Sequence, residues 1–128
     1  MASVNQKIQT ALSDLVSGNI WPLSKPPEED PDVYIVYNPS LETAEDYGDD
    51  IDHEWQDYIQ VHWYARGRVN YLSTKKSIRS RLRNAGFALS EIAVIEHDSD
   101  GGSGSSGIGW THLCFSCSIV EDDPYGES

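Results

Sequence analysis

A glycine-serine run at residues 102–107 has the G-x-G-x-x-G spacing of dinucleotide-binding loops. In such loops a helix follows directly, because its backbone N–H groups and its dipole hold the pyrophosphate. Here residues 110–120 have the pattern of a strand, and no Lys-Ser/Thr pair completes a phosphate loop. The sequence therefore predicts a flexible connector over 98–109, which orders on assembly as a docking or lumen element through Gly101, Gly102, Gly104 and Gly107.

Cys114 and Cys117 have the C-x-x-C spacing of redox and zinc sites. On a strand, residues three apart point to opposite faces, so the two sulfur atoms diverge unless a bulge intervenes. A zinc site also needs a second ligand pair, which the sequence does not contain. We expect two small, mostly buried residues in a reducing compartment, with an active dithiol as the alternative.

A run of acids could crowd around a divalent cation, as Asp46, Asp49, Asp50, Asp52, His53 and Glu54 fall within a few residues of one another. His53-Glu54 lacks the second histidine of a metalloprotease helix, and the four histidines of the chain are scattered. No serine or cysteine has a neighbour that would act as its base. The sequence predicts a solvated acidic loop over 42–54, no enzymatic activity, no catalytic residues, no metal site and no cofactor.

The charges are sorted by position along the chain. Twelve of the 21 acids lie within 28–57 and eight within 91–127, whereas seven of the nine basic residues lie between them in a stretch without acids. Solubility alone favours interspersed charges, so segregation indicates a docking surface, with a merely solvated helix face as the alternative. The predicted contact joins basic residues of one subunit (Arg66, Arg68, Lys75, Lys76, Arg79, Arg83) to acids such as Asp46, Asp49, Asp50 and Asp52 of a neighbouring subunit or tail protein.

The elements that position these residues follow from apolar spacing. Ser3 and Gln6 form a capping box before a helix that ends near Gly18, and residues 33–38 form a short strand that Pro39 stops. Residues 55–65 alternate as a long strand with one buried face.

A second helix starts after Asn70, its apolar stripe comprises Tyr71, Ile78, Leu82 and Ala85, and Gly86 ends it. Strands over 91–97 and 110–120 complete the order α-β-β-α-β-β. The predicted fold is α+β: a four-stranded, largely antiparallel sheet with helices packed on one face.

Length and composition fit one domain over 1–128 with an acidic tail over 121–128. The N-terminal residues show neither a signal peptide nor a membrane anchor, so we expect a protein of the cytoplasm. A net charge of -12 argues against nonspecific binding of nucleic acid by the whole surface.

Four segments resemble the tail-completion proteins of long-tailed bacteriophages, also called tail-terminator or tail-to-head joining proteins. They are the runs Tyr-Ile-Val-Tyr-Asn at 34–38, Asp-Tyr-Gly-Asp-Asp at 46–50, Tyr-Ile-Gln-Val-His-Trp-Tyr at 58–64 and Leu-Arg-Asn-Ala-Gly-Phe at 82–87. The resemblance covers most of the chain, including the order of its elements.

This resemblance implies a siphovirus virion protein that forms a ring, typically a hexamer, at the head-proximal end of the tail tube. Such a ring ends tube polymerisation, joins the tail to the head connector or head-closure protein, and lets DNA pass through its lumen without specific binding. The protein would be assembled in the host cytoplasm, and no membrane is involved.

Two alternatives stay open. Another neck component, such as a head-closure or connector protein, shares the size, acidity and ring symmetry. A small nucleic-acid-binding module could instead use the basic helix together with Tyr58 and Tyr64.

Overall fold

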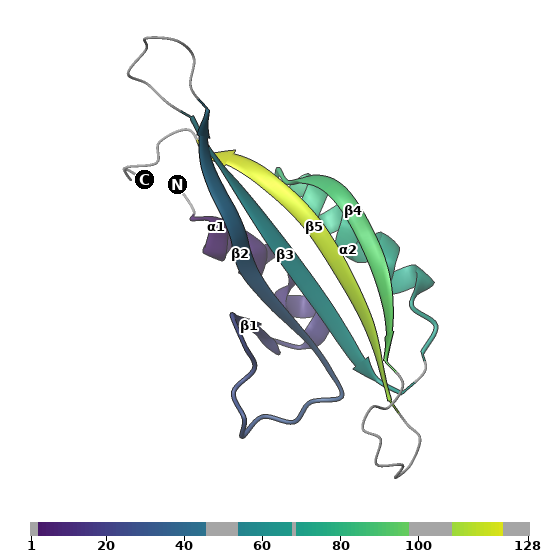
Figure 1. Ribbon diagram of the computed structural model, residues 1–128. Coiled ribbons are helices and arrows are strands. Elements are labelled where there is room, and N and C mark those ends of the chain that lie inside the picture. Colours follow the sequence, from purple (N-terminus) through teal and green to yellow (C-terminus); the bar gives the residue numbers. More distant parts are fainter. Residues whose placement is uncertain (1–2, 46–53, 68, 98–108, 122–128) are drawn as a thin grey trace.

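The computed structural model describes residues 3–45, 54–67, 69–97 and 109–121. Its elements are α1 (Val4–Leu12), a 3-10 turn (Ser13–Val16), β1 (Ile20–Pro22), β2 (Val33–Glu45), β3 (Glu54–Arg66), α2 (Leu72–Asn84), β4 (Ala88–His97) and β5 (Trp110–Glu121). The strands form one twisted sheet in the order β1-β2-β3-β5-β4 (Figure 1). β1 runs parallel to β2, and every other neighbouring pair is antiparallel.

Both helices lie on the same face of the sheet (Figure 1). α1 lies behind β2 and β3, and α2 lies behind β5 and β4. The opposite face has no covering element among the described residues. The sheet and the two helices form two layers with a core between them, and the other face of the sheet is bare among the described residues.

The α+β class is confirmed, but the predicted four-stranded sheet and the order α-β-β-α-β-β are wrong. The sheet has five strands because Ile20–Pro22 adds a parallel edge strand to β2. A left-handed Ser17 (φ 53°) and Gly18 (φ 83°) turn the chain after α1, and the Asn19 carbonyl accepts from the Ile35 amide at 2.9 Å. A strand of three residues is too short to show a period of two, so its sequence carries no strand signal.

The predicted stop at Pro39 is also wrong. β2 continues to Glu45 through a register shift between Pro39 and Leu41. Proline is tolerated at a bulge or on an edge because no ladder hydrogen bond is lost there. The predicted acidic loop over 42–54 is therefore shorter at its start, because Glu42 and Glu45 belong to β2.

The helix signals were mostly confirmed. Ser3 and Gln6 form the predicted capping box, with 3.1 Å for each of its two hydrogen bonds. Asn70 accepts from the Leu72 amide at 3.1 Å at the start of α2, although Tyr71 is the formal N-cap. Gly86 has the predicted left-handed conformation (φ 102°), and the Phe87 amide donates back to the Leu82 carbonyl at 3.0 Å.

The core lies between the sheet and the two helices. α1 contributes Ile8 and Leu12, and α2 contributes Ile78 and Leu82, all fully buried. Phe115, at the centre of β5, is the largest fully buried side chain. The predicted alternation of the long strand is confirmed where its side chains are described, since those facing the helices are buried: Ile59, Val61, Trp63 and Ala65.

Candidate docking surfaces

The first candidate surface is one flank of α2, here called the basic flank: Lys75, Lys76, Arg79 and Arg83. Lys75, Arg79 and Arg83 are four residues apart, so they share one side of the helix. Lys76, Arg79 and Arg83 are exposed. Within residues 3–45, 54–67, 69–97 and 109–121, the ion pairs involve only Arg66 and Arg81, so the basic flank has no carboxylate partner there.

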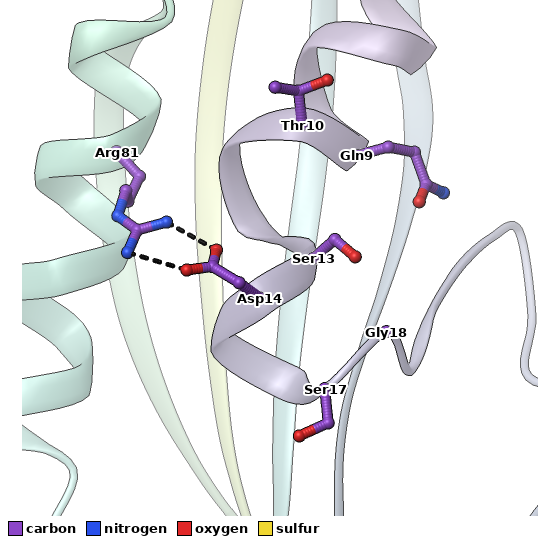
Figure 2. Close-up of a pocket in the computed structure, with 7 residues that line it drawn as sticks. All are labelled: Gln9, Thr10, Ser13, Asp14, Ser17, Gly18 and Arg81. Atoms are coloured by element: carbon purple, nitrogen blue, oxygen red, sulfur yellow. Dashed lines mark hydrogen bonds and ion pairs between the residues drawn. The ribbon is translucent and has the colours of Figure 1, made fainter.

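The opposite flank of α2 is neutralised within the chain. Arg81 donates to both carboxylate oxygens of Asp14, at 2.7 and 3.2 Å, and to the Ala11 carbonyl at 3.0 Å (Figure 2). The hydrogen bond from Arg81 holds the pKa of Asp14 below its usual value. These bonds tie α2 to the end of α1.

A shallow hollow beside this ion pair is shown in Figure 2. Its lining is mostly small and polar: Gln9, Thr10, Ser13, Asp14, Ser17, Gly18 and Arg81. Its only charged groups already bind each other, so its lining offers no free base beside the hydroxyls of Thr10, Ser13 and Ser17. The hollow offers no chemistry beyond the contact between the helices.

Arg66, one of the predicted interface residues, has partners within its own chain. Its Nε donates to Asp32 at 2.8 Å and its Nη2 to Asp30 at 2.9 Å. The guanidinium also lies over the Trp110 ring, 4.7 Å from the centroid. Arg66 therefore stands apart from the basic flank, and Arg68 lies outside the described residues.

The second candidate surface is on the bare face of the sheet, and we call it the aromatic cluster: Trp21, Tyr34, His62, Tyr64, Trp110 and His112. Tyr64 stacks between two of these rings, with centroid distances of 4.8 Å to Tyr34 and 4.2 Å to His112. Tyr34 also meets Trp110 edge-on at 5.7 Å. The cluster spans four strands and contains no acid.

The cluster contains two histidines that contact each other, His62 on β3 and His112 on β5. His62 Nδ1 and His112 Nε2 are 2.8 Å apart and share a hydrogen bond. Burial lowers the pKa of His62, so its imidazole is neutral at pH 7. Burial also raises the pKa of Tyr34 and of Tyr64, so both phenols keep their protons. Tyr34, His62 and Tyr64 are thus uncharged rings, and cations lie at the margin of the cluster, with Arg66 over Trp110 and Lys25 over Tyr34.

The sequence did not predict that His62 and His112 lie together, because they are far apart along the chain. Strand alternation already placed His62 and Tyr64 on one face of β3. Only the pairing of Tyr64 with His112 in the β3–β5 register brings the second histidine to the same spot. The two histidines are 50 residues apart in the chain, and no local pattern predicts this register.

The nucleic-acid alternative needed the basic helix and the tyrosines on one surface. Tyr58 and Tyr64 lie on the face of β3 that points away from the helices, because residues at odd positions of that strand fill the core. α2 lies on the other face of the sheet (Figure 1). The two features are therefore on opposite sides of the molecule.

Both cysteines are buried and free, as predicted. Burial raises the pKa of Cys117 to about 12, and it also raises the pKa of Cys114, so both are poor nucleophiles at neutral pH. No group of three His, Cys, Asp or Glu side chains within the described ranges could hold a metal ion.

The remaining predicted contact residues lie outside the described residues: Asp46, Asp49, Asp50 and Asp52, and Gly101, Gly102, Gly104 and Gly107. The strand ends beside them are described. Glu45 pairs with Glu54, and His97 pairs with Trp110, at opposite ends of the sheet (Figure 1). The acidic segment and the glycine-serine segment are therefore attached to opposite ends of the subunit.

Comparison with known proteins assigns no family to this chain, because no family model and no curated protein matches it. Among the described helices, none has both the length and the apolar character that crossing a bilayer would require.

Proposed function

We propose that this chain is a structural subunit of a ring at the head-proximal end of a bacteriophage tail tube, where it ends tube polymerisation and joins the tail to the head. The observation that carries the proposal is the basic flank on a chain whose net charge is -12. Four cations on one helix side have no partner within the described ranges, although the same chain neutralises Arg66 and Arg81. A surface of that kind suits an acidic partner.

Identical subunits supply such a partner. If the basic flank of one copy meets acids of the next, the contact is heterologous and repeats around a closed ring. The acids around Asp46, Asp49, Asp50 and Asp52 are the proposed counterpart, with a hexamer as the proposed ring.

Opposite ends of the subunit then face different neighbours. The tail-tube protein would bind one end and the head connector or head-closure protein the other, with the glycine-serine segment as a docking or lumen element. DNA would pass through the lumen without specific binding, since a net negative wall does not bind phosphate. The protein would reside at the head–tail junction, assembled in the host cytoplasm, and its role requires no catalytic residue and no cofactor.

Charge reversal of the flank tests the proposal. The double variant Arg79→Glu and Arg83→Glu should lose ring formation and attachment to tail tubes, because like charges would then face the acids of the neighbour. Native mass spectrometry measures the ring, and negative-stain electron microscopy measures the decoration of tube ends. Wild-type assembly by this folded variant would contradict the proposal.

A matched pair separates position from net charge. Arg79→Gln with Arg83→Gln and Thr10→Glu with Ser24→Glu each change the net charge by two, and all four residues are exposed, with Thr10 and Ser24 away from α2. Only the arginine pair removes the basic flank, so only that pair should impair assembly. Equal losses would show that overall charge, and not this surface, controls association.

The phenotype of a phage lacking the gene separates a terminator from another neck component. Loss of a terminator should give overlong tails and tailless heads. Tails of normal length would instead favour a head-closure or connector protein. A gel-shift titration at low salt addresses nucleic acid, and tight, salt-sensitive DNA binding by the isolated chain would contradict the structural role.

A further inference from the structure

The sheet has a free edge at β4. This strand pairs with β5 from Ala88 to His97 and is the last strand of the sheet, with no described partner on its other side. Residues 92–95 read Ile-Ala-Val-Ile, and Val94 is 42% exposed. Natural edges are usually blocked by charged side chains, proline or a bulge, and β4 has a bulge between Leu89 and Glu91 near its start and glutamates at positions 91 and 96. The rest of the strand is suited to pairing with another chain.

The other side of the sheet also has a free edge. β1 pairs only with residues 35–37 of β2, and the last hydrogen bond there runs from the Leu23 amide to the Tyr37 carbonyl at 2.8 Å. β2 continues to Glu45. Its backbone over residues 38–45 therefore has no described strand on that side. Pro39 has no N–H to donate and lies at the register shift, so residues 41–45 are the regular part of this edge.

Strand directions make the two free edges compatible. β2 is antiparallel to β3, β3 to β5, and β5 to β4, so β4 runs opposite to β2. A second copy in the same orientation would bring its β2 alongside the first copy's β4 in antiparallel sense. Antiparallel pairing is already the pattern of four of the five strands of this sheet.

Charge selects which edges meet. Arg81 contacts α1, so the basic flank lies on the side of α2 that is turned away from α1. α2 itself lies behind β5 and the edge strand β4 (Figure 1). The free half of β2 includes Glu42 and Glu45, within the stretch that carries twelve of the 21 acids. Pairing β4 with β4 would bring two basic flanks together, and pairing β2 with β2 would bring two acidic stretches together. Only the head-to-tail combination brings the four cations of the basic flank to the edge that carries Glu42 and Glu45. β4 itself has two glutamates, Glu91 and Glu96, so the basic flank stays in excess on its side of the contact.

We infer that the subunits associate by sheet extension: β4 of one copy adds to the free half of β2 of the next, and the basic flank lies against the acidic stretch of that neighbour. This inference rests on the proposed ring and specifies the surfaces that form it. Main-chain hydrogen bonds supply the contact, and the charges set its direction and its partner.

Hydrogen exchange of the assembled ring against the dissociated subunit tests the inference directly. The amides within residues 40–45 and 91–97 that point to the free edge should exchange at least about tenfold more slowly in the ring, because pairing removes them from water. Residues of β3 and β5, paired on both sides in the monomer, should change little. A ring without slower exchange in both edges would overturn sheet extension while leaving the ring intact. A chain that stays monomeric at every concentration would overturn both proposals.

A pair of valines provides matched variants. Val94 on the edge strand and Val120 near the end of β5 are 42% and 41% exposed. Among the described residues, β4 pairs with β5 only as far as Ser118, so Val120 lies outside both proposed edges. Val94→Lys places a charge on the edge and should raise the dissociation constant of self-association at least about tenfold. Val120→Lys adds the same charge outside the proposed contact and should change it less than about threefold. Circular dichroism checks that both variants fold, and equal effects of the two would contradict the inference.

Discussion

The two faces of the sheet bury their side chains by different means. On the covered face, Ile35, Val61 and Phe115 are fully buried beneath the two helices. On the bare face, Tyr34, Tyr64 and His112 have no layer above them and shield one another by stacking. β3 contributes to both faces, because successive side chains of a strand point in opposite directions.

Alternate side chains of β3 therefore belong to the core and to the aromatic cluster. Burial under another layer removes nearly all apolar area from water, and this face should dominate stability. Lateral stacking leaves ring edges accessible, so the bare face should contribute less to stability and remain available for contact.

The largest effect should come from the covered face. Phe115→Ala would leave a cavity under the helices and should lower the free energy of unfolding by about 3–5 kcal/mol. Phe115→Leu keeps most of the volume and should cost under about 1.5 kcal/mol. Urea titration followed by circular dichroism measures both, and similar losses for the two variants would contradict a tightly packed core at this position.

A smaller effect should come from the centre of the aromatic cluster. Tyr64→Ala removes two stacking contacts from a half-buried position and should cost about 1–2 kcal/mol. Tyr64→Phe retains the ring and should stay near the wild-type value. A loss for Tyr64→Ala as large as that for Phe115→Ala would show that the bare face contributes as much to stability as the core.

The bare face should also make stability depend on pH. Burial lowers the pKa of His62 in the folded chain below its ordinary value of 6.5, so below about pH 6.5 the unfolded chain binds more protons. Stability should therefore fall as the pH drops through this range and level off below the lowered pKa. The difference between wild type and His62→Gln, measured by urea titration from pH 8 to pH 5, isolates this contribution. Parallel pH profiles would contradict it.

The smallest effect should distinguish the two flanks of α2, which lie at the outside of the covered face. Arg81→Gln removes the bonds to Asp14 and to the Ala11 carbonyl and should lower the melting temperature. Arg79→Gln removes the same charge but no described contact, so the melting temperature should stay unchanged. Differential scanning fluorimetry compares the two, and added salt should narrow the gap by screening the ion pair. A larger loss for Arg79→Gln would contradict its assignment to a free surface.

The sequence by itself determined the features that depend on near neighbours. Capping by Ser3 and Gln6, the buried alternation of Ile59 to Ala65 and the left-handed Gly86 all follow from the conformational preferences of a few adjacent residues. The segregation of charge along the chain is likewise a property of the sequence alone.

Tertiary structure alone decided the features that depend on distant partners. The short β1 exists because β2 offers an edge to pair with, and β2 passes Pro39 because β3 continues beside it. Packing also determined which cations are neutralised. Arg66 and Arg81 form ion pairs with carboxylates 34 to 67 residues away, whereas the basic flank forms no ion pair among the described residues. Such pairings depend on sheet register and helix placement, and these are set by burial of the whole core, which no short window of sequence contains.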